Sequence, residues 1–162
     1  MSGRGSFWLE GFEFDNAGTD SGVRIMPAAE VNGSYNNMHT SLTVKNFKIG
    51  RRLGETAASG ISGGVETLLV EDGDIYDFGN GSGQEHNVYA SARTMTWRGV
   101  RNRRTRGWPG AYWSGFAALE GHIFKLSAVT GTIEGCSIDC ALPGDQSLLL
   151  DLKAGGNWTV RG

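Results

Sequence analysis

Tyr89, Lys125 and Asp151 are the residues whose types and spacing most suggest chemistry. Each is a polar side chain placed between two apolar ones. Alternate side chains of a β-strand face opposite sides, so apolar neighbours that point inward would direct all three outward. A lysine or tyrosine held near a bound molecule can act as a general acid or base. The other interpretation is a surface Lys–Asp pair worth about 0–1 kcal/mol.

A repeated six-residue phrase sets the distances between these residues. It consists of an apolar residue, a charged residue, a small turn-former, two variable positions and a final apolar or polar residue. The leading residues of its copies are Leu9, Val44, Val70, Trp97, Ile133 and Val160. Their intervals are 35, 26, 27, 36 and 27 residues. A period in the twenties with insertions of about nine residues is typical of a solenoid.

Equal steps in sequence predict that equivalent residues stack at strand spacing, about 4.8 Å. Tyr89 and Lys125 each precede a leading apolar residue by eight positions, and Asp151 precedes one by nine. One interior ladder would contain Trp97, Ile133 and Val160, and another Val88, Phe124 and Leu150. Tyr89, Lys125 and Asp151 would form an outward column, flanked on the same face by Asn87, Ser91 and Ser127.

Composition supports a single all-β domain over residues 1–162. The chain has 26 glycines and three prolines, short strand-like runs, and no window with clear helical periodicity. We expect strands at 23–26, 42–49 and 65–75, a connection over 50–64, and the longest insertion at 102–119. A β-sandwich is the alternative fold, but hairpin turns would not produce the fixed register.

Charge and hydropathy exclude several classes of function. The net charge is −2, which argues against a dedicated nucleic-acid binder, and no apolar run is long enough to span a membrane. Residues 1–5 lack an apolar signal core, so we expect a cytoplasmic protein, or a periplasmic or extracellular one whose signal was removed. The phrases at both ends predict a segment of a longer solenoid, or open ends that self-associate or are covered by a partner.

The second half of the chain resembles bacterial right-handed parallel β-helix proteins of the pectate-lyase-like superfamily. The resemblance covers residues 84–162, and the first half only as generic coils. It is carried by Glu85–Tyr89, Gly121–Ala128, Thr132–Gly135, Ser147, Leu150–Leu152 and Gly155-Gly156. It implies a right-handed parallel β-helix of about six coils, in a superfamily that includes polysaccharide lyases, hydrolases and epimerases.

The resemblance also implies an acidic polysaccharide as partner. Lys125, followed by Leu126 and Ser127, resembles the Lys-Ser strand of alginate and chondroitin lyases. Removal of the proton alpha to a uronate carboxylate needs a base and a cation that stabilises the enolate. Lys125 would be the base or the carboxylate neutraliser, and Tyr89 and His122 the proton carriers.

His86 and His122 lie three residues before Tyr89 and Lys125. Stacked histidines could act as acid and base or bind a metal, and each could equally satisfy a turn carbonyl in a buried corner, which we favour.

An arginine-rich and aromatic insertion is the second candidate binding element. It contains Arg98, Arg101, Arg103, Arg104, Arg106, Trp108, Tyr112 and Trp113. Arginine forks bind carboxylates, and aromatic faces stack on sugar rings, so this set predicts a polysaccharide clamp. The alternative is a solvated loop whose aromatic residues pack over the side of a coil.

No cofactor or metal is expected. The acidic cluster of Glu71, Asp72, Asp74 and Asp77 matches no calcium loop, although calcium is the one metal that it would suit. Cys136 is expected to fill a small core or turn position and Cys140 to be a free thiol, since a disulfide across so short a loop is geometrically demanding. The alternative function is a non-catalytic solenoid module, such as a phage fibre, an adhesin or a self-assembling segment.

Overall fold

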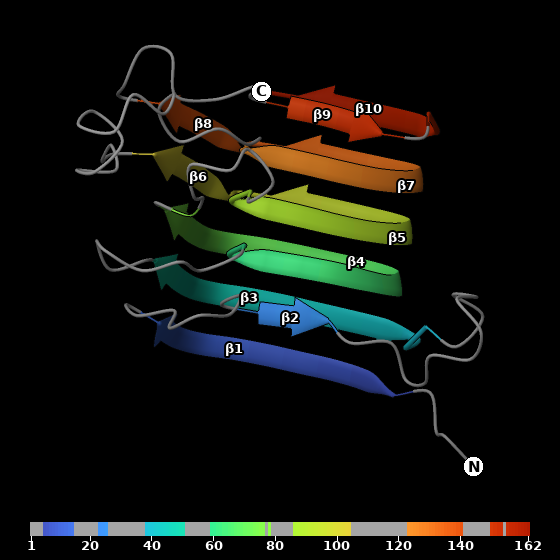
Figure 1. Ribbon diagram of the computed structural model, residues 1–162, viewed down its shortest axis with the longest axis horizontal. Coiled ribbons are helices and arrows are strands. Elements are labelled where there is room, and N and C mark those ends of the chain that lie inside the picture. Colours follow the sequence, from blue (N-terminus) through green and yellow to red (C-terminus); the bar gives the residue numbers. More distant parts are fainter. Residues whose placement is uncertain are drawn as a thin grey trace, which may run out of the picture.

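All regular secondary structure in the described part of the chain is β-strand (Figure 1). The computed structural model describes residues 5–14, 23–25, 38–50, 59–76, 78, 86–104, 123–140, 150–153 and 155–162, and only the backbone at 23–25, 104 and 140. The strands are β1 (Ser6–Phe14), β2 (Val23–Ile25), β3 (Ser41–Gly50), β4 (Ile61–Tyr76), β5 (Val88–Arg98), β6 (Arg101–Arg104), β7 (Phe124–Glu134), β8 (Ser137–Cys140), β9 (Leu150–Lys153) and β10 (Asn157–Arg161). None of the described residues forms a helix that could cross a lipid bilayer.

Every described strand pair is parallel. The main order is β1-β3-β4-β5-β7-β10, and Figure 1 shows these strands one above the next along the molecule. Parallel neighbours need a crossover connection rather than a hairpin. The arrangement is therefore compatible with a β-helix and does not match the antiparallel sheets of a β-sandwich.

The paired segments fall into three stacks, because the long strands bend. The first stack contains residues 61–65, 88–92, 124–128 and 150–153, with β2 beside the start of β4. The second stack contains residues 6–10, 41–45, 67–71, 94–98, 130–134 and 157–161. The third stack contains residues 12–14, 47–50, 73–76, 101–104 and 137–140.

The third position of the six-residue phrase forms the corner between the second and third stacks. The backbone there has positive φ in five copies: Gly11 (69°), Asn46 (49°), Asp72 (52°), Gly99 (59°) and Gly135 (56°). Glycine, asparagine and aspartate adopt this left-handed conformation at the lowest cost. The expectation that this position forms a turn is confirmed.

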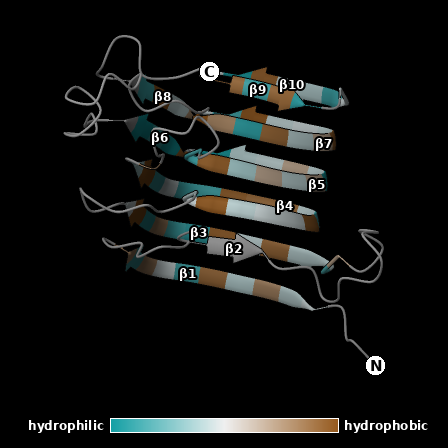
Figure 2. Cartoon of the chain, in the orientation of Figure 1, coloured by the Kyte–Doolittle hydropathy of each residue, from teal (hydrophilic) through white to brown (hydrophobic). Residues whose placement is uncertain are grey.

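The interior ladders predicted from the phrase are confirmed. The leading residues Leu9, Val44, Val70, Trp97, Ile133 and Val160 pair in one continuous register across the second stack. Val88, Phe124 and Leu150 form the corresponding ladder of the first stack. Trp97 is fully buried and meets the Phe124 ring edge-on at 5.1 Å. Figure 2 shows the resulting alternation of apolar and polar residues along the strands.

One extra residue separates β9 from β10 and explains the spacing of nine before Val160. Lys153 lies opposite Ser127, and Asn157 lies opposite Thr130. Two residues of β7 separate Ser127 from Thr130, whereas three residues separate Lys153 from Asn157 on the neighbouring segment. Gly155 and Gly156 have φ of 69° and 95°. A Cβ at Gly156 would lie 2.1 Å from the carbonyl oxygen of Ala128, so only glycine fits.

Two expectations about the strands were wrong. Residues 61–64, assigned to a connection, are the start of β4, because pairing with β5, and of residues 61–63 also with β2, outweighs the weak strand propensity of Gly63 and Gly64. Asn87, expected on the outer face, is buried immediately before β5. Its amide donates to Asn102 Oδ1 at 2.7 Å and accepts from the Phe78 amide at 3.2 Å, so it supports the interior.

Candidate functional site

The outward column of Tyr89, Lys125 and Asp151 is present in the predicted register. Tyr89 of β5 lies opposite Lys125 of β7, and Lys125 lies opposite Asp151 of β9. Their apolar neighbours point into the first stack, so the three polar side chains face outward, with Tyr89 exposed and the other two half-buried.

His86 completes this group from a position just before β5. Its Nε2 lies 3.0 Å from Lys125 Nζ, and its buried ring meets the Tyr89 ring edge-on at 5.4 Å. Lys125 Nζ also lies 5.0 Å from the centre of the Tyr89 ring. The lysine amine is therefore held between an imidazole and an aromatic face. We call His86, Tyr89, Lys125, Asp151 and Lys153 the Lys125 cluster.

The surroundings of Lys125 disfavour its charged form. Burial lowers the pKa of the Lys125 amine below its usual 10.5, and the nearby Lys153 lowers it further. Asp151 opposes this effect, because a carboxylate favours the protonated amine. A lysine with a lowered pKa supplies more neutral amine, which is the form that can accept a proton.

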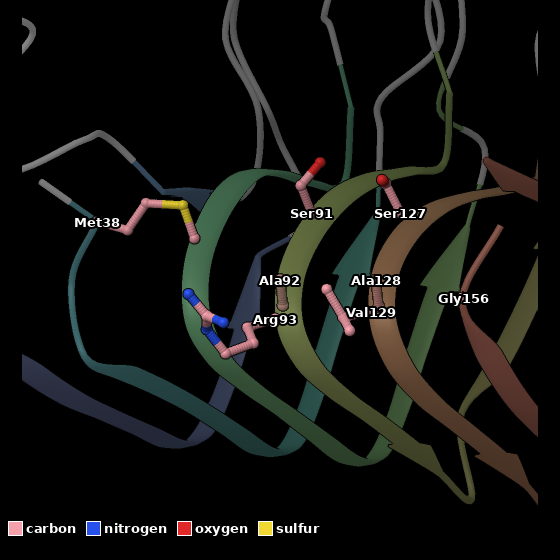
Figure 3. A pocket seen from close by; sticks show the side chains of 8 residues that line it. All are labelled: Met38, Ser91, Ala92, Arg93, Ser127, Ala128, Val129 and Gly156. Atoms are coloured by element: carbon pink, nitrogen blue, oxygen red, sulfur yellow. The ribbon is translucent and has the colours of Figure 1, made fainter. Parts of the chain in front are cut away.

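An open pocket of about 460 Å³ adjoins the column. It is lined by Met38, Ser91, Ala92, Arg93, Ser127, Ala128, Val129 and Gly156 (Figure 3). Ser91 and Ser127 lie two residues beyond Tyr89 and Lys125 on the same strands, and Figure 3 shows them pointing the same way. The pocket therefore continues the outward surface of the first stack toward its corner with the second.

Arg93 and Lys153 are members of this surface that sequence reasoning missed. Arg93 lines the pocket from β5, and Lys153 of β9 lies opposite Ser127. Both side chains are exposed cations. Strand parity could have identified both residues, because Arg93 lies an even number of positions after Tyr89 and Lys153 an even number after Asp151.

A second outward column runs along the second stack and differs in character. Its members, which we call the charge column, are Glu10, Lys45, Glu71, Arg98, Glu134 and Arg161. Their charges alternate in sign from each strand to the next. Glu71 forms ion pairs with both Lys45 and Arg98, and Arg98 Nε lies 3.4 Å from Glu134 Oε2.

Contacts within the charge column favour the ionised forms of Glu71 and Arg98. The hydrogen bond from Lys45 lowers the pKa of Glu71 below its usual 4.5, against the opposing effect of burial. The hydrogen bond to Glu134, and then the charge of Glu71, raise the pKa of Arg98.

The described arginines of the predicted clamp lie away from Lys125, Arg98 on the second stack and the others on the third. Arg103 forms two hydrogen bonds to Asp74, at 2.9 and 2.7 Å, and lies 5.0 Å from the Tyr76 ring centre. Arg101 lies 3.6 Å from Asp139. Arg104 is described only as backbone of β6, and the clamp residues Arg106, Trp108, Tyr112 and Trp113 lie outside the described residues, as does His122.

The predicted acidic cluster is divided among cations of the protein. Glu71 is bound by Lys45 and Arg98, and Asp74 by Arg103, while Asp77 lies outside the described residues. Among the residues that the structure describes, no group of three or more His, Cys, Asp or Glu side chains is placed to hold a metal.

Cys136 is a free, half-buried thiol packed against the core, as expected for a turn position. Its Sγ lies 3.6 Å from the Glu134 carbonyl oxygen, and burial raises the pKa of the thiol.

Comparison of the chain with protein-family profiles, with curated protein sequences and with solved structures finds no significant match.

Proposed function

We propose that the chain is a right-handed parallel β-helix of about six coils, of the pectate-lyase-like kind, that binds an acidic polysaccharide along the outer face of its first stack. Three parallel stacks with a common register support the fold. The neighbouring cations Lys125 and Lys153, together with Arg93 in the wall of the pocket, support an anionic ligand, because carboxylates bind charged donors strongly. The pocket that Ser127 lines, two residues beyond Lys125 on the same strand, offers room for part of a sugar unit.

The observation that carries the proposal is the placement of Lys125. Its amine contacts His86 and the Tyr89 ring and has a lowered pKa, and Ser127, two residues further along the same strand, lines an open pocket. A surface lysine that only stabilised the fold would be expected beside a carboxylate as its closest partner. In this cluster the Lys125 amine instead lies within hydrogen-bond distance of an imidazole nitrogen.

The chemistry proposed for a bound uronate is β-elimination or epimerisation. The neutral Lys125 amine removes the proton from the carbon alpha to the carboxylate, and the electron pair moves into the carboxylate as an enolate. Lys153, which lies near the Lys125 amine, stabilises that charge. In elimination the enolate collapses, a carbon–carbon double bond forms, and the β C–O bond breaks as the Tyr89 hydroxyl protonates the leaving oxygen. In epimerisation a proton returns to the carbon from the opposite face.

The test is to incubate the protein with alginate, pectate and glycosaminoglycans, and to measure both binding and the ultraviolet absorbance of unsaturated uronate. Lys125→Met should reduce product formation by about 10²–10⁴-fold, the usual contribution of a general base. The rate should rise with pH toward a plateau, with an apparent pKa below the usual 10.5 of lysine. Lys48→Met is the control, because Lys48 lies on the third stack and pairs with Glu13 at 2.5 Å.

Two results would decide against this function. Binding without any unsaturated or epimerised product would remove the catalytic part and leave polysaccharide binding. Neither product nor binding, with Lys125→Met unchanged in every property, would favour the second candidate, a non-catalytic structural or adhesive module. That candidate is supported by the exposed apolar residues of the two outermost strands of the second stack.

A further inference from the structure

The two outermost strands of the second stack expose residues that belong to its interior ladders. Phe7 and Leu9 of β1 are 49% and 38% exposed, and Val160 of β10 is 58% exposed. The equivalent ladder residues of the strands between them, such as Val44 and Trp97, are fully buried. The exposure therefore results from the absence of a further described strand on each outer edge and not from the residue types.

The two edges match each other in residue type and charge. If β1 of one copy lay beside β10 of another in the register of the phrase, Leu9 would stack on Val160 and Phe7 on Trp158. Glu10 would then lie beside Arg161. This juxtaposition continues the alternation of the charge column, in which every neighbouring pair already has opposite signs.

We propose that the β10 edge of one copy pairs in parallel with the β1 edge of a second copy, with Val160 opposite Leu9 and Arg161 opposite Glu10. The contact uses the same backbone ladder and side-chain register as the strands within one copy. Exposed strand edges are templates for such pairing, because their backbone N–H and C=O groups lack partners on one side.

The contact joins two different surfaces, so it is heterologous. Each bound copy still presents a free β1 edge at one end and a free β10 edge at the other, and addition can continue without closing. The expected product is an open linear assembly whose length increases with protein concentration. Pairing of β1 with β1, or of β10 with β10, would instead stop at two copies.

The test uses one blocked edge at a time, with sedimentation velocity as the readout. Leu9→Lys and Val160→Lys each place a charge on a ladder position that must be desolvated in the contact. Both positions are exposed in a single copy, so circular dichroism should show an unchanged fold. Val129→Lys is the matched control, because Val129 is 63% exposed but lies on the side of the strands rather than at an outer edge.

The wild-type chain and Val129→Lys should sediment as larger species with increasing concentration, and each edge variant alone should stay a single copy. An equimolar mixture of the two edge variants should form pairs and nothing longer, because only one complementary pair of edges remains. A wild-type chain that stays a single copy at every concentration would overturn the proposal. So would self-pairing of either edge variant, or a mixture that forms no pairs. None of these readouts depends on polysaccharide binding.

Discussion

The outward columns of the first and second stacks differ in how their charged side chains are paired. In the charge column every neighbouring pair has opposite signs, and Glu71, the most buried member, contacts two cations. In the Lys125 cluster the half-buried lysine lies near a second lysine, an imidazole and an aromatic ring, with one carboxylate beside it. The first arrangement lowers the pKa of a carboxylate, and the second lowers the pKa of an amine.

The contrast favours a structural role for the charge column and agrees with the chemical role that we propose for the Lys125 cluster. Alternating signs at strand spacing favour the charged forms and oppose any slip in register that would bring like charges together. A lysine short of anionic partners adds little to the stability of the fold, and groups with such perturbed pKa values concentrate at functional sites. Charge removal should therefore have opposite consequences in the two columns.

Glu71→Leu is expected to have the largest effect on stability. It leaves Lys45 and Arg98 as neighbouring cations without their shared carboxylate. We expect the free energy of unfolding to fall by about 2 kcal/mol, less than for a fully buried pair because both cations can regain water. Chemical denaturation at neutral pH would measure this loss.

Glu134→Leu in the same column is the matched control. Its side chain is 40% exposed, compared with 9% for Glu71, and exposed pairs contribute little. Acid supplies a second check. Because the folded-state pKa of Glu71 is lowered, its contribution is present above the usual 4.5 and is lost as the pH falls through the folded value. The difference between wild type and Glu71→Leu should therefore shrink in acid.

Exchange of the charges at Glu71 and Arg98 is expected to have an intermediate effect. An isolated ion pair tolerates such a swap. In this column, however, the arginine introduced at position 71 would lie beside Lys45, and the glutamate introduced at position 98 would lie beside Glu134. We expect the exchange to lower stability at low salt by less than Glu71→Leu does, since these contacts are partly exposed. The loss should decrease in high salt because screening weakens like-charge repulsion. If the exchange left the stability unchanged, the charge column would be a set of independent ion pairs.

Lys125→Met is expected to have the smallest effect on stability, and in the opposite direction. A lowered lysine pKa means that the folded state binds the proton less well than the unfolded chain does, so the charge opposes folding at neutral pH. Methionine keeps an unbranched apolar stem without the charge. The melting temperature should be unchanged or higher at neutral pH, and the difference should disappear above pH 10.5. A clear fall in melting temperature would show that Lys125 is structural.

Much of the fold could be predicted because register in a stacked parallel sheet follows directly from sequence spacing. Six leading residues at regular intervals were enough to place Trp97 between Val70 and Ile133, and Tyr89 beside Lys125. The alternating signs of the charge column were visible in the second position of each copy. The ion pairs that these charges form can be recognised only when the copies are aligned as neighbours in space.

Contacts made by residues outside the regular strands could not be predicted in this way. His86 precedes β5, so its approach to Lys125 on the next rung depends on the path of the turn rather than on strand parity. Asn87 was predicted on the wrong face for the same reason, because it lies one residue before the strand and points inward. Met38, which also lines the pocket, lies just before β3. The repeat spacing does not fix its position relative to β5, because it lies outside the strands.

The glycine pair at residues 155 and 156 has a consequence for how such a chain can vary in length. One added residue is absorbed between β9 and β10, and the ladders on either side keep their partners. Single-residue insertions at the equivalent bends of β5 or β7 should therefore be tolerated when they introduce glycine and rejected when they introduce a branched side chain. The bend between the first and second stacks is thus a place where the chain can gain a glycine without a change in the pairing of the neighbouring strands.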